Sequence, residues 1–216
     1  MLADALRCAP PGAVALVDGR RTISYGALPA LIEREIDWLR ESGAERHAML
    51  ADNGVPWALA DLALHVGRLL SVPLPGSFTS AQVAHALDDA GIDALLTDDE
   101  ALARELLPGW RLDGSSPVSG LHRFRRQLDL ASRAIAPADT RKITYTSGST
   151  SNPKGVCLSG PALEAIAESV RRSDRHAGSR GTRRKRSPAR VDDPSVQVPD
   201  GAACVPARCA SPALPA

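Results

Sequence analysis

Long apolar runs are absent from this 216-residue sequence. The most apolar stretch, residues 57–70, contains Asp61 and Arg68, and it falls far short of the ~20 clean apolar residues that span a bilayer. Near the N-terminus, Asp4 and Arg7 interrupt the region where a secretory signal needs an uninterrupted apolar core. We therefore expect neither a membrane span nor an export signal, and the expected location is cytoplasmic.

Residue spacings typical of metal sites are also lacking. No two cysteines form a C-x-x-C pair, and no histidines group near them in the manner of a zinc site. The acidic clusters at residues 88–89 and 98–100 fall at the ends of predicted helices, where carboxylates favour solvent or the helix dipole. We therefore predict no protein metal site, reduced thiols, and ordinary surface or core roles for the histidines. These residues are Cys8, Cys157, Cys204 and Cys209, and His47, His65, His85, His122 and His176.

Aromatic residues are scarce, at 3% of the chain, whereas its 44% hydrophobic and 24% charged residues are near the average for globular proteins. The net charge of +1 is unevenly distributed. Nine Arg and one Lys against four Asp give residues 171–216 a charge of +6, which leaves −5 for residues 1–170. Arguments about binding to nucleic acid or membranes therefore concern the tail alone.

Short apolar runs alternate with segments of helical periodicity over residues 13–107. The pair Asp18-Gly19 favours a tight turn between two strands, and Ser80 and Gly91 are the expected N-cap and stop of one helix. Strands that alternate with helices of this length predict an α/β fold with a layered, largely parallel sheet and flanking helices. The predicted strands are residues 13–17, 22–25, 48–51, 70–74 and 94–97, and the predicted helices are residues 28–39, 57–66, 80–90 and 99–107.

Residues 108–141 are harder to interpret, because glycine and proline interrupt the pattern around a possible strand at residues 118–124. We expect this segment to be a surface connection. A β-prone run at residues 142–145 then leads into a polar loop, and apolar residues 156–158 follow it. The loop is therefore expected between two strands, with a helix after it that carries apolar residues on one face up to Val170.

The polar loop, residues 146–155, has the composition of a polyphosphate-binding site. Glycines let backbone N–H groups approach phosphate oxygens, hydroxyls add donors without bulk, and a lysine supplies positive charge. It is not a Walker motif, because glycine rather than a hydroxyl residue follows the lysine. A flexible Ser/Thr/Gly connection is the alternative for such a composition. The predicted site residues are Thr146, Ser147, Gly148, Ser149, Thr150, Lys154 and Gly155.

The order of residues favours the first interpretation. Residues 146–156 read T-S-G-S-T-S-N-P-K-G-V, which resembles the T-S-G-[ST]-T-G-x-P-K-G-V loop of the adenylate-forming (AMP-binding, acyl-CoA synthetase-like) enzyme superfamily. Ser151 departs from the family glycine, and a serine is strained if that position needs a positive φ. Upstream segments are similar as well, among them Tyr25 with Leu28, residues 52–57 (D-N-G-V-P-W) and residues 72–75 (V-P-L-P). The resemblance covers about residues 13–170, which it identifies as an incomplete N-terminal domain of the adenylate-forming fold.

The resemblance implies ATP-dependent activation of a carboxylic acid. The carboxylate attacks the α-phosphorus of MgATP and releases pyrophosphate, and the acyl group usually passes on to a thiol such as coenzyme A. Residues 146–150 and Lys154 would hold the β- and γ-phosphates. The family motifs for adenine, ribose, magnesium and the acyl pocket do not follow residue 170, so we expect a truncated protein that is inactive as this chain. The acid and the oligomeric state are not predicted.

Residues 171–216 differ in amino-acid composition from the rest of the chain. The last aromatic residue is Tyr145, and the final 46 residues hold nine Arg, six Pro and eight Ala, a composition that predicts a disordered basic tail. One hypothesis is out-of-frame translation of a GC-rich gene, and another is a genuine disordered linker. The alternative function is a non-catalytic interaction module whose residues 183–186, R-R-K-R, bind nucleic acid.

Overall fold

The computed structural model describes residues 9–128, 136–146 and 153–178, with only the backbone for residues 171–178. A small antiparallel hairpin of β1 (Val14–Val17) and β2 (Thr22–Ser24) precedes a seven-stranded sheet. The strands of that sheet are β3 (Arg46–Leu50), β4 (Leu70–Pro73), β5 (Ala94–Thr97), β6 (Arg111–Ser115), β7 (His122–Arg125), β8 (Thr140–Thr146) and β9 (Lys154–Ser159). The helices are α2 (Leu28–Glu41), α3 (Val55–Val66), α4 (Ser80–Asp89), α5 (Glu100–Leu106) and α6 (Gly160–Gly178).

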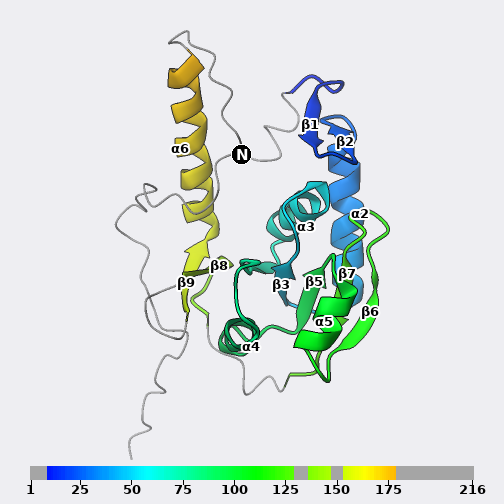
Figure 1. The fold of residues 1–216 in the computed structure, drawn as a ribbon. Helices are drawn as coiled ribbons and strands as arrows, with labels where there is room; N and C mark the ends of the chain where they lie inside the picture. Colours follow the sequence, from blue (N-terminus) through cyan, green and yellow to red (C-terminus); the bar gives the residue numbers. More distant parts are fainter. Residues whose placement is uncertain (1–8, 129–135, 147–152, 179–216) are drawn as a thin grey trace, which may run out of the picture.

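The sheet has the strand order β6-β7-β5-β3-β4-β8-β9, and its four central strands are parallel (Figure 1). The predicted α/β fold with a largely parallel sheet is therefore confirmed. Both edges are antiparallel, however, because β6 and β7 are joined by a short turn and β8 and β9 by the polar loop. Short connections of this kind can only reverse the chain direction.

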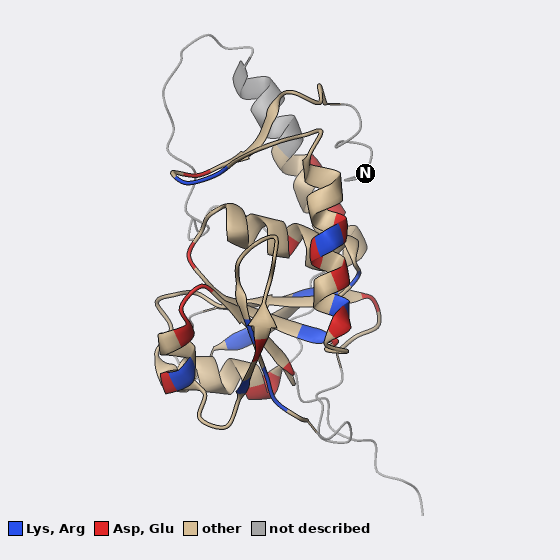
Figure 2. Ribbon diagram, turned by 90° about the vertical axis from the view of Figure 1, so that its right-hand side faces the viewer, with Lys and Arg blue, Asp and Glu red and all other residues tan. Residues whose placement is uncertain are grey.

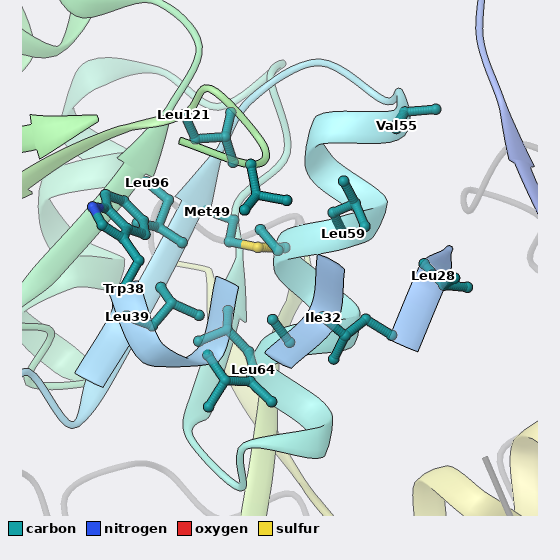
Figure 3. Close-up of a cluster of buried hydrophobic side chains, with 14 of the residues drawn as sticks. Leu28, Ile32, Trp38, Leu39, Met49, Val55, Leu59, Leu64, Leu96 and Leu121 are labelled. Atoms are coloured by element: carbon teal, nitrogen blue, oxygen red, sulfur yellow. The ribbon is translucent and has the colours of Figure 1, made fainter. Parts of the chain in front are cut away.

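Helices cover both faces of the sheet. Successive side chains of a strand point to opposite faces, so each strand contributes apolar residues to both. Met49 of β3 and Leu96 of β5 face the cluster formed with α2 and α3, whereas Leu95 faces the cluster formed with α4 and α5. Figure 3 shows the first cluster, to which α2 contributes Leu39, α3 contributes Leu64 and β3 contributes Met49. These three side chains are fully buried, so the two helices and the sheet share one apolar layer.

Two local predictions are corrected by the structure. The N-cap of α4 is Thr79 rather than Ser80, because the Thr79 hydroxyl accepts the backbone N–H of Gln82 in a reciprocal capping box. The strand expected at residues 118–124 begins only at His122, since Gly120 has a φ of 83° in the turn before it. The neighbouring segment is a hairpin, β6 and β7, and not simply a surface connection.

A buried carboxylate organises this turn. Glu35 of α2 is fully buried and accepts hydrogen bonds from the hydroxyls of Ser116 and Ser119, and from the Ser119 backbone N–H at 3.2 Å. A buried charge needs such donors to offset its lost hydration. The turn is therefore held inward against α2, where the sequence pattern indicated an exposed loop.

Candidate functional site

The polar loop connects β8 to β9 at one edge of the sheet. Tyr145 lies opposite Gly155, and Thr146 lies opposite Lys154, in the antiparallel pairing of the two strands. The expected position of the loop between two strands is thus confirmed. Thr146, Lys154 and Gly155 come together at its base, whereas four predicted site residues lie outside the described residues: Ser147, Gly148, Ser149 and Thr150.

The base of the loop lies at the carboxyl edge of the parallel strands. β8 runs parallel to β4, β4 to β3 and β3 to β5, so Thr146 at the end of β8 shares this edge with the ends of the other three strands. At the same edge, the Asp98 carboxylate accepts the backbone N–H of Asp52 at 3.0 Å. Open α/β sheets bind ligands outside the carboxyl ends of their strands.

Thr146 and Lys154 offer complementary donors at this edge. Both residues are exposed, and the Thr146 hydroxyl donates a long hydrogen bond, at 3.5 Å, to the Lys154 carbonyl oxygen. Within the described residues Lys154 forms no ion pair, so its ammonium group is available for an anion. A hydroxyl and a cation on directly opposite residues of a strand pair are both able to donate to an anion.

Gly155 is buried directly behind these two residues. A Cβ atom at this position would lie 3.0 Å from Cγ2 of Ile143 and 3.1 Å from Cζ of Tyr145. The side chains of β8 therefore favour glycine here for reasons of packing alone. The predicted contact of Gly155 with phosphate stays a prediction.

Tyr145 fixes the strand that leads into the loop. Its hydroxyl donates to the Asp89 carboxylate at 2.7 Å, and it lies 3.3 Å from the Ala86 carbonyl oxygen, both on α4. Burial, and then the hydrogen bond to Asp89, raise the pKa of the Tyr145 phenol well above its usual value, so the phenol keeps its proton and remains a donor. Tyr145 was not among the predicted site residues, although the period-two alternation with Ile143 indicates that it faces inward.

His85 of α4 reaches the other end of the loop. Its Nε2 atom lies 3.2 Å from the carbonyl oxygen of Pro153, the residue before Lys154. The sequence analysis assigned His85 no special role. No local pattern could have indicated this contact, because His85 and Pro153 are 68 positions apart.

A partly buried ion pair supports β8 from the opposite face of the sheet. The Lys142 ammonium group lies 2.7 Å and 2.9 Å from the two carboxylate oxygens of Asp61 on α3. The Ser71 hydroxyl of β4 lies 3.4 Å from the same carboxylate. β8 is thus tied to helices on both of its faces.

The acidic clusters have structural partners. The predicted positions at helix ends are confirmed, because α4 ends at Asp89 and the Asp99 carboxylate caps α5 by accepting the Leu102 N–H. Asp88 pairs with Arg126 of the segment after β7. Across the described ranges, no group of three or more His, Cys, Asp or Glu residues is placed to hold a metal ion.

The helix that follows the loop crosses the boundary expected at residue 170, since α6 continues to Gly178. The basic run at residues 183–186 lies outside the described residues. In the part that is described, acidic and basic residues are interspersed over the fold rather than separated by sign (Figure 2). No helix in these ranges has both the length and the apolar character to cross a membrane.

Comparison with known proteins agrees with this geometry. A protein-family model described as AMP-binding enzyme matches residues 3–186. A 3-[(3aS,4S,7aS)-7a-methyl-1,5-dioxo-octahydro-1H-inden-4-yl]propanoyl:CoA ligase from Mycobacterium tuberculosis is 33% identical over 167 residues, which cover 68% of this chain and 32% of the ligase. The chain therefore spans about a third of this curated relative.

Solved structures share the fold. The o-succinylbenzoate CoA synthetase from Bacillus subtilis, in complex with its acyl-adenylate intermediate, superposes with a TM-score of 0.55 at 21% identity, over 79% of this chain and 45% of the synthetase. The N-terminal subdomain of NpsA from Klebsiella oxytoca superposes with a TM-score of 0.53 at 21% identity, over 74% of this chain and 41% of that protein. The chain belongs to the AMP-binding, adenylate-forming enzyme family and corresponds to the N-terminal portion of its fold.

Proposed function

We propose that residues 146–155 bind the β- and γ-phosphates of MgATP. The observation that carries this proposal is the pair of Thr146 and Lys154, an exposed hydroxyl beside an exposed cation at the carboxyl edge of the sheet. Family membership supports it, because members of an AMP-binding family handle adenine nucleotides. Magnesium would arrive with the nucleotide.

Each described residue has a distinct part in this proposal. The Lys154 ammonium group offsets the charge that accumulates on the leaving pyrophosphate. The Thr146 hydroxyl exchanges its 3.5 Å hydrogen bond to the Lys154 carbonyl for one to a phosphate oxygen. Gly155 keeps β9 close to β8 so that Thr146 and Lys154 stay opposite each other. Ser147, Gly148, Ser149 and Thr150 supply further donors in the same proposal.

The reaction of the whole fold would be adenylation of a carboxylic acid. A carboxylate oxygen attacks the α-phosphorus, the bond to the β-phosphate oxygen breaks, and acyl-AMP and pyrophosphate result. A thiol such as coenzyme A then displaces AMP. A cytoplasmic location, where ATP and coenzyme A are abundant, belongs to the same proposal.

We expect the 216-residue chain by itself to bind phosphate groups but not to turn over. It spans 32% of the curated ligase and 45% of the solved synthetase, and loop contacts alone do not align the α-phosphorus with a carboxylate. Pyrophosphate-dependent exchange of label into ATP, with a panel of fatty and aryl acids, measures this directly. Exchange above background that Lys154→Ala abolishes would contradict the expected inactivity while supporting the site.

The binding experiment is titration calorimetry of the chain with inorganic pyrophosphate and with MgATP. We expect Lys154→Ala to weaken binding at least tenfold, since one charge-assisted contact is worth about 1.5–3 kcal/mol. Arg111→Ala is the matched control, because it removes one exposed positive charge from β6 at the far edge of the sheet. An equal loss of affinity in Lys154→Ala and Arg111→Ala would mean that the anions are bound only by the general positive charge of the chain, and it would overturn the proposal.

A further inference from the structure

One helix holds both ends of the polar loop. The side chain of His85 contacts the carbonyl of Pro153, which precedes Lys154, and Asp89 accepts the hydroxyl of Tyr145, which precedes Thr146. His85 and Asp89 are four residues apart in α4, so they lie on the same face of the helix, one turn from each other. α4 therefore contacts the strand that enters the loop and the segment that leaves it.

The His85 contact has a defined direction. A carbonyl oxygen only accepts hydrogen bonds, so the Nε2 atom of His85 must carry the proton. The distance from Nε2 to the oxygen, 3.2 Å, is at the long end of the usual range for such a bond. Pro153 is buried, which limits competition from water for its carbonyl.

The backbone at Pro153 has little remaining freedom. The proline ring fixes φ, and the hydrogen bond to the carbonyl oxygen restrains ψ, because that oxygen belongs to the planar peptide unit leading to Lys154. With both soft dihedral angles restrained, α4 sets the position of the Lys154 Cα atom together with the strand pairing of Lys154 and Thr146. An ordinary residue at 153, or a free carbonyl, would leave one of the two angles open.

We propose that His85 is a positioning residue for Lys154: by holding the Pro153 carbonyl, it sets where the cation of the phosphate loop stands before any nucleotide binds. The inference rests on the proposed function only for the role of Lys154. The hydrogen bond that restrains Pro153 is a property of the chain without ligand, and it can be tested without one.

The first test reads the hydrogen bond directly in the ligand-free chain. Long-range proton–nitrogen NMR spectra at neutral pH report which ring nitrogen of His85 carries the proton, and we expect Nε2–H. Amide exchange at Lys154 and Gly155 should accelerate severalfold in His85→Phe, which keeps the bulk of the ring but has no donor, and should stay near wild type in His85→Gln, which keeps an N–H donor. A His85 ring protonated only at Nδ1, or exchange that is equal in both variants, would overturn the proposal.

The second test measures the consequence for the site. We expect His85→Phe to weaken pyrophosphate binding by about fivefold, the equivalent of one ordinary hydrogen bond, and His85→Gln to restore affinity to within about twofold of wild type. His65→Phe is the matched control, since this residue is on α3, which covers the opposite face of the sheet. Thermal unfolding of each variant separates a local effect from loss of fold.

The outcomes separate the two proposals. If Lys154→Ala abolishes pyrophosphate binding while His85→Phe binds like wild type, the phosphate site stands and the positioning role of His85 is wrong. If the wild-type chain binds no pyrophosphate, the proposed function fails, and the NMR and exchange results still decide whether His85 holds Pro153.

Discussion

The phenol oxygen of Tyr145 lies 2.7 Å from a carboxylate oxygen of Asp89, and this bond joins the end of β8 to the end of α4. Tyr145 is only 6% exposed, so its hydroxyl requires an internal partner. Because Tyr145 immediately precedes Thr146, the bond also fixes where the polar loop begins.

Removing this hydroxyl should cost stability without changing the packing. Tyr145→Phe keeps the ring against Gly155 but loses a hydrogen bond to a charged acceptor, which contributes about 1.5–3 kcal/mol. We expect the free energy of unfolding in urea to fall by about 2 kcal/mol. Tyr25→Phe, at a residue of the N-terminal hairpin region, is the control. A loss below about 0.5 kcal/mol in Tyr145→Phe would mean that the bond to Asp89 contributes little.

Gly155 should not tolerate even a methyl group. An added Cβ atom would lie 3.0 Å and 3.1 Å from side-chain atoms of Ile143 and Tyr145, both of which are buried. Overpacking of this kind costs about 1–3 kcal/mol. We expect thermal unfolding of Gly155→Ala at a clearly lower temperature than wild type, whereas Gly76→Ala, where a Cβ meets nothing within 4 Å, should be close to neutral. Equal behaviour of the two variants would contradict the packing argument.

The helices and strands could be predicted well because their signals are local. Alternation along a strand places Met49 and Leu95 on opposite faces, and helical periodicity places Ile32 and Leu39 against the sheet, whatever the rest of the chain does. The loop was equally visible, since its donors are consecutive in sequence. The strand expected at residues 118–124 begins only at His122, because a partner 84 positions away, Glu35, holds Ser119 in a turn.

The surroundings of the loop could not be predicted for the same reason. His85 lies on a helix whose own sequence reads as an ordinary amphipathic segment, and only the folded sheet brings it to Pro153. Lys142 likewise lies 81 positions from Asp61 in a strand with no unusual composition. Contacts between residues far apart in the chain leave no pattern in a single sequence. The residues that support the loop from neighbouring elements are therefore visible only in the structure, whereas the donors within the loop are visible in the sequence.

His47 should make the fold sensitive to mild acid. It is fully buried, neither ring nitrogen has a hydrogen-bond partner among the described residues, and burial lowers the pKa of the imidazole from 6.5 to about 4. The folded pKa is below the unfolded one, so the unfolded chain takes up the proton first as the pH falls. Stability attributable to His47 is therefore full above about pH 6.5, decreases between about pH 6.5 and pH 4, and is constant below that range.

This contribution amounts to about 2 kcal/mol between about pH 7 and pH 5. We expect His47→Leu, which removes the titrating ring, to remove that much of the pH dependence of unfolding in urea. His65→Leu is the control, because His65 is partly exposed on α3. A slope with pH that is the same in wild type and His47→Leu would show that the imidazole can take up a proton without penalty.

Substitutions of Asp61 and Lys142 should have non-additive effects on the free energy of unfolding, because the two side chains form an ion pair. Their side chains are 21% and 17% exposed, so each charge has lost much of its hydration and depends on the other. Lys142→Met alone leaves the Asp61 carboxylate with only the distant Ser71 hydroxyl, at 3.4 Å, and we expect it to cost about 2 kcal/mol, less than for a fully buried pair. Asp61→Leu combined with Lys142→Met removes both charges at similar volume, and it should be more stable than Lys142→Met alone.

Urea unfolding of the two single variants and the double variant measures the coupling. If the two single losses simply add in the double variant, solvent already screens the pair, and β8 is held to the sheet by its strand hydrogen bonds and by α4.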